Sequence, residues 1–265
     1  MPKFAANVSM LFTEHPFLER FAHAKAAGFQ AVEFLFPYEH DIGAIADELR
    51  RSELEQVLFN LPAGNFAAGD RGMANDPSRV EEFRAGVHQG LKIATELGCG
   101  RLNCLAGLRL DDVLEETQTA TLIENLRFAA DAAASVGVLQ VVEPLNAFDA
   151  PGYFLPTPES GFAIVERAAH PNLLLQYDVY HAQRMSGNLA ATIAARIDLI
   201  GHVQIADSPA RNEPGTGEIN YPFVLQALDD AGYDGWVSLE YRPRHTTEES
   251  LRWLTEMGYW APAQG

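Results

Sequence analysis

The sequence predicts an α/β protein, a closed (β/α)8 TIM barrel formed by a single domain over residues 1–265. Three observations support this prediction. Short apolar segments alternate eight times with segments of helical periodicity. The apolar segments are hydrophobic on both faces, as is typical of parallel strands covered by helices. The length of 265 residues suits eight such units in one barrel, and no linker-like segment divides the chain.

The expected strands are rich in β-branched, aromatic and leucine residues, and most of them end close to a polar or turn-forming residue. They cover residues 4–10, 31–37, 56–62, 101–107, 139–146, 173–181, 199–207 and 235–243.

The expected helices lie between these strands and after the last one. Gly28, Gly98 and Gly232 follow three of them at the position where a glycine commonly ends a helix. Asn220 is the expected N-cap of the seventh helix. The eight helices cover residues 15–27, 41–52, 79–97, 117–136, 158–169, 188–196, 220–231 and 247–257.

Two connections from a strand to the next helix are long for this architecture, residues 63–78 and residues 208–219. Both follow the C-terminal end of a strand, which is the face where such barrels build their active sites. The second connection contains the glycines of a G-T-G turn at 215–217. We therefore expect both connections to border the functional site.

The composition excludes several classes of function. The net charge of −17 disfavours binding to nucleic acid or to an anionic membrane. No segment approaches the length of an apolar membrane span, and the N-terminus lacks a signal-peptide pattern, so a cytoplasmic protein is expected. Cys99 and Cys104 are the only cysteines and are expected to be small buried residues without a disulfide. The sequence is compatible with a homo-oligomer.

Each expected strand carries a polar side chain near its C-terminal end. Burying such groups is costly unless they are paired or bind something. On strands five to eight, residues two positions apart share a face, and the opposite faces are apolar, so the polar groups point into the barrel. The eight residues are Asn7, Glu33, Asn60, Asn103, Glu143, Asp178, Gln204 and Glu240.

The last four of these residues predict a metal site. Glu143, Asp178 and Glu240 supply carboxylates and Gln204 supplies an amide oxygen, which together form a hard, oxygen-rich site suited to Mg²⁺, or alternatively Mn²⁺. Without a cation the carboxylates would repel one another and at least one would stay protonated. Either state provides acid-base chemistry. No feature of the sequence requires an organic cofactor.

Two histidines belong to the expected strands. His181 lies three residues after Asp178 and is expected to contact the substrate or a metal-bound water. His202 lies one inward layer below Gln204, where a supporting hydrogen bond is expected. His40 flanks a connection from a strand to a helix, and its role is left open. The other histidines are expected to be solvated on helices or exposed turns, namely His15, His23, His88, His170 and His245.

Motifs spread over nearly the whole chain resemble the hydroxypyruvate isomerase family, a branch of the xylose isomerase-like barrels. The resemblance implies interconversion of hydroxypyruvate and tartronate semialdehyde (2-hydroxy-3-oxopropanoate), with two glutamates as proton donor and acceptor at Glu143 and Glu240. The metal pattern of the family falls on Glu143, Asp178, Gln204 and Glu240. The motifs are ANVSMLFTE, VEFLFPY, FNLPAGNFAAGDRGMA, LNCLAG, EPLNAFDAPGYFL, QYDVYHAQRM, QIADSPARNEPGTGEINY and GWVSLEYRP.

The substrate implied by this resemblance is a small 2-oxo or hydroxy acid, and its carboxylate requires a cation. Arg211 is the first candidate and Arg242 the second, although the family more often has lysine at the latter position. Asn103 and His181 are further expected substrate contacts. Phenylalanines at positions 12, 66 and 154 are expected to exclude water from the opening.

Three alternatives remain open at this point. The 2-oxo-tetronate isomerases share the fold and most of the motifs, although NLPAG, NCLAG and EPLNAFDAPGYF are more similar to the hydroxypyruvate branch. A non-catalytic barrel that binds sugar acids would keep the pocket without needing an acid-base pair. A DNA-repair endonuclease would fit the barrel but conflicts with the acidic surface.

Overall fold

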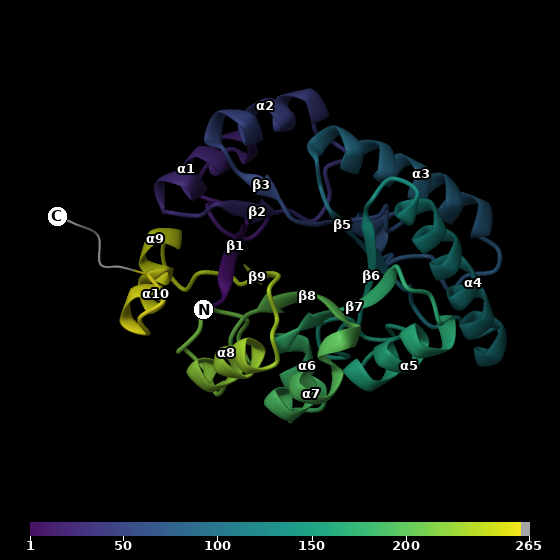
Figure 1. Cartoon of the computed structure of the whole chain (residues 1–265). Coiled ribbons are helices and arrows are strands. Elements are labelled where there is room, and N and C mark those ends of the chain that lie inside the picture. The colour runs from purple at the N-terminus through teal and green to yellow at the C-terminus, as the bar shows by residue number, and fades with distance from the viewer. Residues whose placement is uncertain (261–265) are drawn as a thin grey trace.

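Parallel strands form one sheet that curls into a barrel with the helices outside it (Figure 1). The computed structural model describes residues 1–260, so positions 261–265 of the expected domain lie outside the described residues. The strand order is β3-β2-β1-β9-β8-β7-β6-β5-β4, and every adjacent pair is parallel. The strands are β1 (Lys3–Asn7), β2 (Ala31–Glu33), β3 (Glu55–Gln56), β4 (Phe59–Asn60), β5 (Arg101–Leu105), β6 (Leu139–Glu143), β7 (Leu173–Asp178), β8 (Ile200–Ile205) and β9 (Trp236–Leu239).

The barrel closes through residues 55–60, which form the third expected strand in two short pieces. Strand β3 pairs with β2, and β4 pairs with β5. Between and after these pieces, the amide of Val57 donates to the carbonyl of Val32 at 2.8 Å, and the amide of Leu61 donates to that of Asn103 at 2.7 Å. One continuous segment therefore joins both edges of the sheet, which confirms the eight-unit barrel predicted from the sequence.

Helices cover the outer face of the barrel (Figure 1). Asn220 caps α8 as predicted, since its side chain accepts a hydrogen bond from the amide of Phe223. Within residues 1–260, no helix is both long and apolar enough to span a membrane. The helices are η1 (Phe17–Glu19), α1 (Arg20–Ala26), α2 (Ile42–Ser52), η2 (Phe66–Ala68), α3 (Val80–Leu97), α4 (Glu115–Ala134), α5 (Pro158–Ala168), α6 (Val179–Met185), α7 (Leu189–Arg196), η3 (Ile197–Leu199), α8 (Tyr221–Asp230), α9 (Thr247–Ser250) and α10 (Arg252–Glu256).

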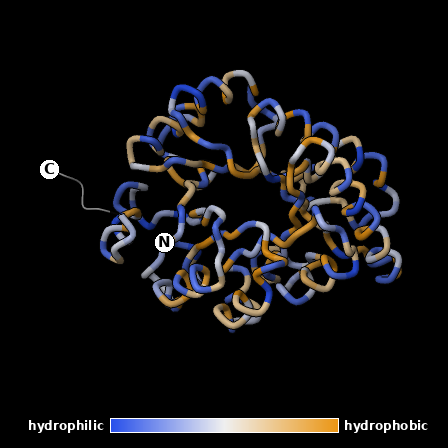
Figure 2. Tube along the Cα trace, viewed as in Figure 1, coloured by the Kyte–Doolittle hydropathy of each residue, from blue (hydrophilic) through white to orange (hydrophobic). Residues whose placement is uncertain are grey.

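Apolar side chains pack in two places. The main core fills the space between the strands and the helices, and it includes the free cysteines Cys99 and Cys104, as predicted. Figure 2 shows hydrophobic positions along the barrel strands and hydrophilic positions at the periphery. A smaller cluster of alanine, valine and leucine side chains, with Ala5, Ala31 and Val141 among them, is separate from this main core. Both clusters support the strands that carry the polar residues.

The sixth expected strand ends earlier than the sequence predicts. Strand β7 stops at Asp178, and α6 begins at the next residue. The carboxylate of Asp178 caps this helix by accepting a hydrogen bond from the amide of Tyr180 at 2.8 Å. Tyr180 and His181 therefore lie in the first turn of a helix, and the prediction that they extend the strand to residue 181 is wrong.

Candidate active site

A cavity of about 480 Å³ opens at the C-terminal end of the barrel. Glu143, His181 and Glu240 line its wall. The connection 63–78 contributes Phe66 and Arg71. The connection 208–219 contributes residues 209–211. Both long connections thus border the cavity, as the sequence predicts.

Three carboxylates stand at the ends of three strands around this cavity. Glu143 ends β6, Asp178 ends β7 and Glu240 follows β9, and each is at most 5% exposed. Burial raises the pKa of Glu143 to about 8, and the charge of Asp178 contributes to the rise. Burial also raises the pKa values of Asp178 and Glu240 above their usual range. The raised pKa of Glu143 therefore favours its protonated form near neutral pH.

Arg211 is the counter-ion of two of these carboxylates. Its Nη2 donates to Oε1 of Glu240 at 2.7 Å and lies 3.4 Å from Oδ2 of Asp178. Its guanidinium also stacks over the ring of Tyr180, with 5.1 Å to the ring centre. Burial lowers the pKa of Arg211, but the charges of Glu240 and Asp178 outweigh this and raise it. The site thus contains one fixed cation facing three carboxylates.

Asn103 positions Glu143. Its Nδ2 donates to Oε2 of Glu143 at 2.7 Å and to Oδ1 of Asn60 at 3.0 Å, so two amides and one carboxylate form a chain across β4, β5 and β6. The Oδ1 atom of Asn103 is buried without a protein partner. The structure therefore connects this expected substrate contact directly to one of the two expected proton-transfer glutamates.

A hydrogen-bonded layer lies beneath the carboxylates. Gln204 donates from Nε2 to Oε1 of Glu33 at 2.7 Å and accepts at Oε1 from Gln176 at 2.6 Å. The Nε2 atom of His202 lies 2.8 Å from Oε2 of Glu33, and Asn7 donates to Oε1 of Glu33 at 2.9 Å. His202 thus has the supporting position predicted for it. Glu33 belongs to this lower layer and does not line the mouth.

The hydrogen bonding of His181 fixes its tautomer. The backbone amide of Asn146 can only donate, and it does so to Nδ1 of His181 at 3.0 Å. A neutral ring then carries its proton on Nε2. Burial lowers the pKa of His181 well below its usual range, so the ring is neutral. The Nε2 atom has no hydrogen-bond partner and lies 3.5 Å from Oδ2 of Asp178. His181 therefore presents a donor to the cavity.

The carboxylates fit a divalent cation. Ligand atoms of Glu143, Asp178 and His181 lie within 4.8 Å of one another, and all three residues are buried. The Oε2 atom of Glu240 is also buried without a partner. Because the proton on Nε2 prevents His181 from acting as a ligand in this tautomer, the available donors are oxygens. Carboxylate oxygens are ligands that divalent cations commonly take in proteins.

Asp207 holds the connection 208–219 in place. Its Oδ1 accepts from the amides of Ser208 and Ile219 at 2.9 and 3.1 Å, and its Oδ2 accepts from those of Gly215 and Gly217 at 2.8 and 2.9 Å. A Cβ atom at Gly217 would lie 2.0 Å from the carbonyl oxygen of Ser208, so this position requires glycine. The prediction that the G-T-G segment forms a turn is therefore confirmed.

The loop acids fix the connection and do not line the cavity. Oε1 of Glu218 accepts from the hydroxyl of Ser208 at 3.0 Å. Oε2 of Glu213 accepts from the amide of Arg244 at 3.1 Å. Arg211 adopts a left-handed backbone conformation, with φ of 58°. Its amide donates to the carbonyl of Asp207 at 2.9 Å, and its carbonyl accepts from the amide of Arg242 at 2.8 Å. These backbone hydrogen bonds fix Arg211 within the loop.

Two further arginines line the mouth. Arg242, which the sequence predicts as a substrate contact, is exposed and lines the cavity. Arg71, which was not predicted, stacks on the ring of Phe66 at 4.2 Å and donates to the carbonyl of Asp70 at 2.8 Å. Its only sequence signal is its place in the long connection 63–78. Among the expected phenylalanines, Phe66 lines the cavity, whereas Phe12 and Phe154 are buried and do not line it.

Comparison with known proteins identifies the family. A family model described as xylose isomerase-like TIM barrel matches residues 21–257. The chain belongs to the xylose isomerase-like TIM barrel family. Within this family, a hydroxypyruvate isomerase of Escherichia coli (strain K12) is 46% identical over 254 residues, covering 96% of this chain and 98% of that protein. A 2-oxo-tetronate isomerase of Cupriavidus necator is 47% identical, with the same coverage of both chains.

Solved structures of the xylose isomerase-like barrels agree with the fold. A structure titled AP endonuclease, family 2, from Brucella melitensis superposes with a TM-score of 0.94 at 46% identity, covering 97% of this chain and 99% of that chain. A D-allulose 3-epimerase from Methylomonas sp. superposes with a TM-score of 0.78 at 20% identity, covering 97% and 99%. The second likeness concerns the fold alone.

Proposed function

We propose that this barrel is an isomerase that interconverts hydroxypyruvate and 2-hydroxy-3-oxopropanoate by proton transfer between two glutamates. The observation that carries the proposal is the pair Glu143 and Glu240, which face one cavity from strands β6 and β9. Burial raises the pKa of both residues. The relatives named hydroxypyruvate isomerase support the choice of substrate.

The reaction moves a carbonyl group between neighbouring carbons. One glutamate removes a proton from the hydroxymethyl carbon of hydroxypyruvate, and an enediolate forms across the two carbons. The other glutamate, initially protonated, returns a proton to the former carbonyl carbon, and the hydroxyl proton moves to the oxygen on that carbon. A base and an acid at the same pH require paired carboxyl groups in different protonation states. Glu240 accepts a hydrogen bond from the Arg211 guanidinium, whereas Glu143 accepts one from the neutral amide of Asn103. These different surroundings support the division of roles.

We propose that Glu143, Asp178 and Glu240, with the amide oxygen of Gln204, hold a divalent cation, Mg²⁺ or Mn²⁺. When bound, such an ion would supply positive charge next to the substrate oxygens. The Oε1 atom of Gln204 accepts one hydrogen bond from Gln176 and keeps a second lone pair for this purpose. Because Arg211 contacts Asp178 and Glu240, its guanidinium would adjust when an ion is present.

The remaining contacts orient the substrate. His181 would donate from Nε2 to a substrate oxygen, and Asn103 would keep Glu143 directed at the reacting carbons. Arg211 would meet the substrate carboxylate from the buried side, and Arg242 and Arg71 would meet it from the opening. These cations offset the net charge of −17 at the point where an anion must enter. We place the reaction in the cytoplasm.

A 2-oxo-tetronate isomerase is the second candidate. A relative with that name is as similar as the hydroxypyruvate isomerase, and a cavity of about 480 Å³ has room for a four-carbon acid. Both candidates use the same proton transfer, so the length of the substrate alone separates them. Initial rates with hydroxypyruvate and with four-carbon 2-oxo-tetronates would rank the two.

A DNA-repair endonuclease is disfavoured, although a structure with such a title is 46% identical. The net charge of −17 repels a phosphate backbone. Fluorescence anisotropy with a duplex containing an abasic site is expected to show no binding at 0.15 M salt. Saturable binding and strand cleavage would replace the isomerase proposal.

Turnover of glutamine variants tests the proposed roles. Glu143→Gln and Glu240→Gln are expected to lower kcat by about 10²–10⁴-fold, because each removes one proton-transfer group. Glu96→Gln is the matched control, since this exposed glutamate lies in the last turn of α3, outside the cavity lining and the active-site loops. Folded Glu143→Gln and Glu240→Gln variants with the turnover of the wild type would exclude the proposed roles.

A further inference from the structure

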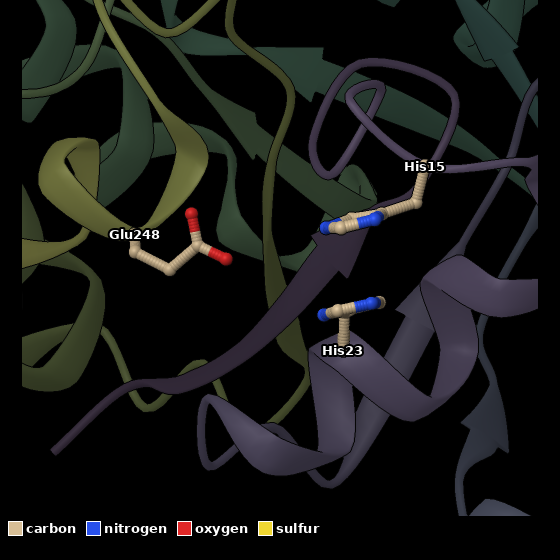
Figure 3. Close-up of side chains that lie close together, drawn as sticks. All are labelled: His15, His23 and Glu248. Atoms are coloured by element: carbon tan, nitrogen blue, oxygen red, sulfur yellow. The ribbon is translucent and has the colours of Figure 1, made fainter.

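A second group of metal-binding side chains lies outside the active-site cavity. His15 on the segment after β1, His23 on α1 and Glu248 on α9 place their ligand atoms within 4.8 Å of one another. Figure 3 shows the two imidazole rings parallel to each other, with the carboxylate of Glu248 beside them. The ring centres are 3.5 Å apart and the ring planes differ by 9°. Two neighbouring segments of the first barrel unit thus meet a helix of the last unit.

Contacts around the group hold it in position. The amide of Phe12 donates to the hydroxyl of Thr247 at 2.7 Å, and the amide of Thr247 donates to Glu14 at 2.7 Å. Arg20 donates from Nε to the carbonyl of His15 at 2.9 Å. These bonds fix the segment 12–15 against the start of α9. The backbones that carry the three side chains are therefore tied together by the protein itself.

The spacing of the ligand atoms suits a zinc-type ion. With zinc-nitrogen bonds of about 2.1 Å, two ligand nitrogens in a tetrahedral site lie about 3.4 Å apart. The ligand atoms of His15, His23 and Glu248 lie within 4.8 Å of one another, so a small movement of the side chains brings them to this spacing. Coordination requires the two rings to tilt toward a common point, and both residues are only half-buried, which leaves room for that movement.

The chemistry of this group differs from that of the active site. Two imidazoles and one carboxylate suit Zn²⁺, Ni²⁺ or Cu²⁺ and do not favour Mg²⁺. The active-site group offers oxygens and a single histidine whose Nε2 carries a proton. Three protein ligands leave a fourth position for water. A soft-to-borderline cation would thus bind selectively at the outer group.

We propose that His15, His23 and Glu248 form a second metal site, of zinc type, that clamps the segment after β1 and helix α1 to α9. The ion would add a link between the first and last units of the barrel, which are already joined by the pairing of β1 with β9. The expected effect is metal-dependent stabilisation of the fold, independent of turnover.

Electron paramagnetic resonance of bound Cu²⁺ tests the proposal, with enough Mg²⁺ present to occupy the active site. The wild type is expected to show superhyperfine coupling to two imidazole nitrogens. His23→Ala is expected to lose one of these nitrogens and to weaken Cu²⁺ binding at least tenfold. His88→Ala, which removes an exposed histidine on α3, is the matched control and should leave the spectrum unchanged.

Zinc stoichiometry gives a second readout. The double variant His15→Ala/His23→Ala is expected to bind one Zn²⁺ fewer than the wild type and to lose the rise in Tm that Zn²⁺ produces. Glu248→Gln preserves the ring stack and should weaken Zn²⁺ binding about tenfold while remaining folded. Equal zinc content and equal Tm shifts in the double variant and the wild type would overturn the proposal, as would a Cu²⁺ spectrum unchanged by His23→Ala.

Discussion

Arg211 donates a 2.7 Å hydrogen bond to Glu240 from a loop that follows a different strand. The same nitrogen lies 3.4 Å from Asp178, so a loop residue serves as the counter-ion of two buried strand-end carboxylates. A single guanidinium leaves the third carboxylate, Glu143, for a proton or a metal ion. This unequal balance of charge is the basis of the chemistry that we propose for the site.

Removing this counter-ion is expected to destabilise the fold. Arg211→Met should lower the free energy of unfolding by about 3–5 kcal/mol in the presence of a chelator, because it leaves buried carboxylates without a cation. Arg242→Met, at an exposed arginine of the same mouth, should change it by less than about 0.5 kcal/mol. Urea denaturation at pH 8 measures both values. An equal loss of unfolding free energy in the two variants would contradict the role of Arg211 as a counter-ion.

Metal removal is expected to abolish turnover. Chelation followed by gel filtration should lower kcat with hydroxypyruvate by at least about 100-fold, because the ion would offset the charge that develops on the substrate oxygens. Adding back Mg²⁺ or Mn²⁺ should restore the rate, whereas Ca²⁺ should restore less, because it prefers longer bonds and a larger site. Full turnover by protein shown to be metal-free would contradict the proposed metal site.

Asp207 accepts hydrogen bonds from four loop amides, so we expect a change of its carboxylate to destabilise the loop. Asp207→Asn replaces one acceptor oxygen with an NH₂ group, which cannot accept the hydrogen bonds of the loop amides. The substitution should therefore lower the free energy of unfolding by about 1–3 kcal/mol. Hydrogen exchange should accelerate over residues 208–219 and KM should rise. Asp198→Asn, on η3, is the control. Unchanged exchange in this loop would show that Asp207 does not organise it.

The pH dependence of stability can be tested at Glu159, away from the cavity. Burial raises its pKa, but its own backbone amide, Ser186 and Thr157 outweigh this and lower it. A lowered folded pKa stabilises the protein above the unfolded value of about 4.5, and the contribution disappears as the pH falls through the folded value.

Glu159→Gln should therefore lower Tm by about 1–2 °C at pH 7, and this difference should vanish near pH 3. Glu96→Gln removes a negative charge from the C-terminal end of α3, where it is unfavourable, and should not lower Tm at pH 7. A Tm difference for Glu159→Gln that stays constant between pH 7 and pH 3 would exclude an ionic origin.

The alternation of strands and helices was sufficient to predict the barrel and the inward direction of its polar groups. The end of β7 was not predictable from hydrophobicity, because Val179 and Tyr180 continue the apolar pattern of the strand. Asp178 decides the boundary by capping α6, and side chains that cap helices also occur inside loops. Asp178 therefore both ends the strand inside the barrel and caps α6, and only its inward position was predicted from the sequence.

The pairings across the mouth depend on contacts between distant segments. Nothing local in the sequence places Arg211 against Glu240, because the contact requires the left-handed backbone at Arg211 and the amides gathered by Asp207. Likewise, the tautomer of His181 follows from the backbone amide of Asn146, a contact that only the folded chain provides. The residue types in the strands predict which polar side chains lie together at the mouth. The loops determine which hydrogen bonds and ion pairs these side chains form.

Deuterium incorporation tests the central claim most directly. The wild-type protein with hydroxypyruvate in D₂O is expected to produce 2-hydroxy-3-oxopropanoate with deuterium at the carbon that becomes protonated, and to exchange deuterium into recovered hydroxypyruvate. Glu143→Gln and Glu240→Gln should each suppress this exchange, whereas Glu96→Gln should not. Product that lacks deuterium would indicate a direct hydride shift, or transfer of a proton that does not exchange with the solvent. Deuterium uptake in both glutamine variants equal to that of the wild type would contradict proton transfer by Glu143 and Glu240.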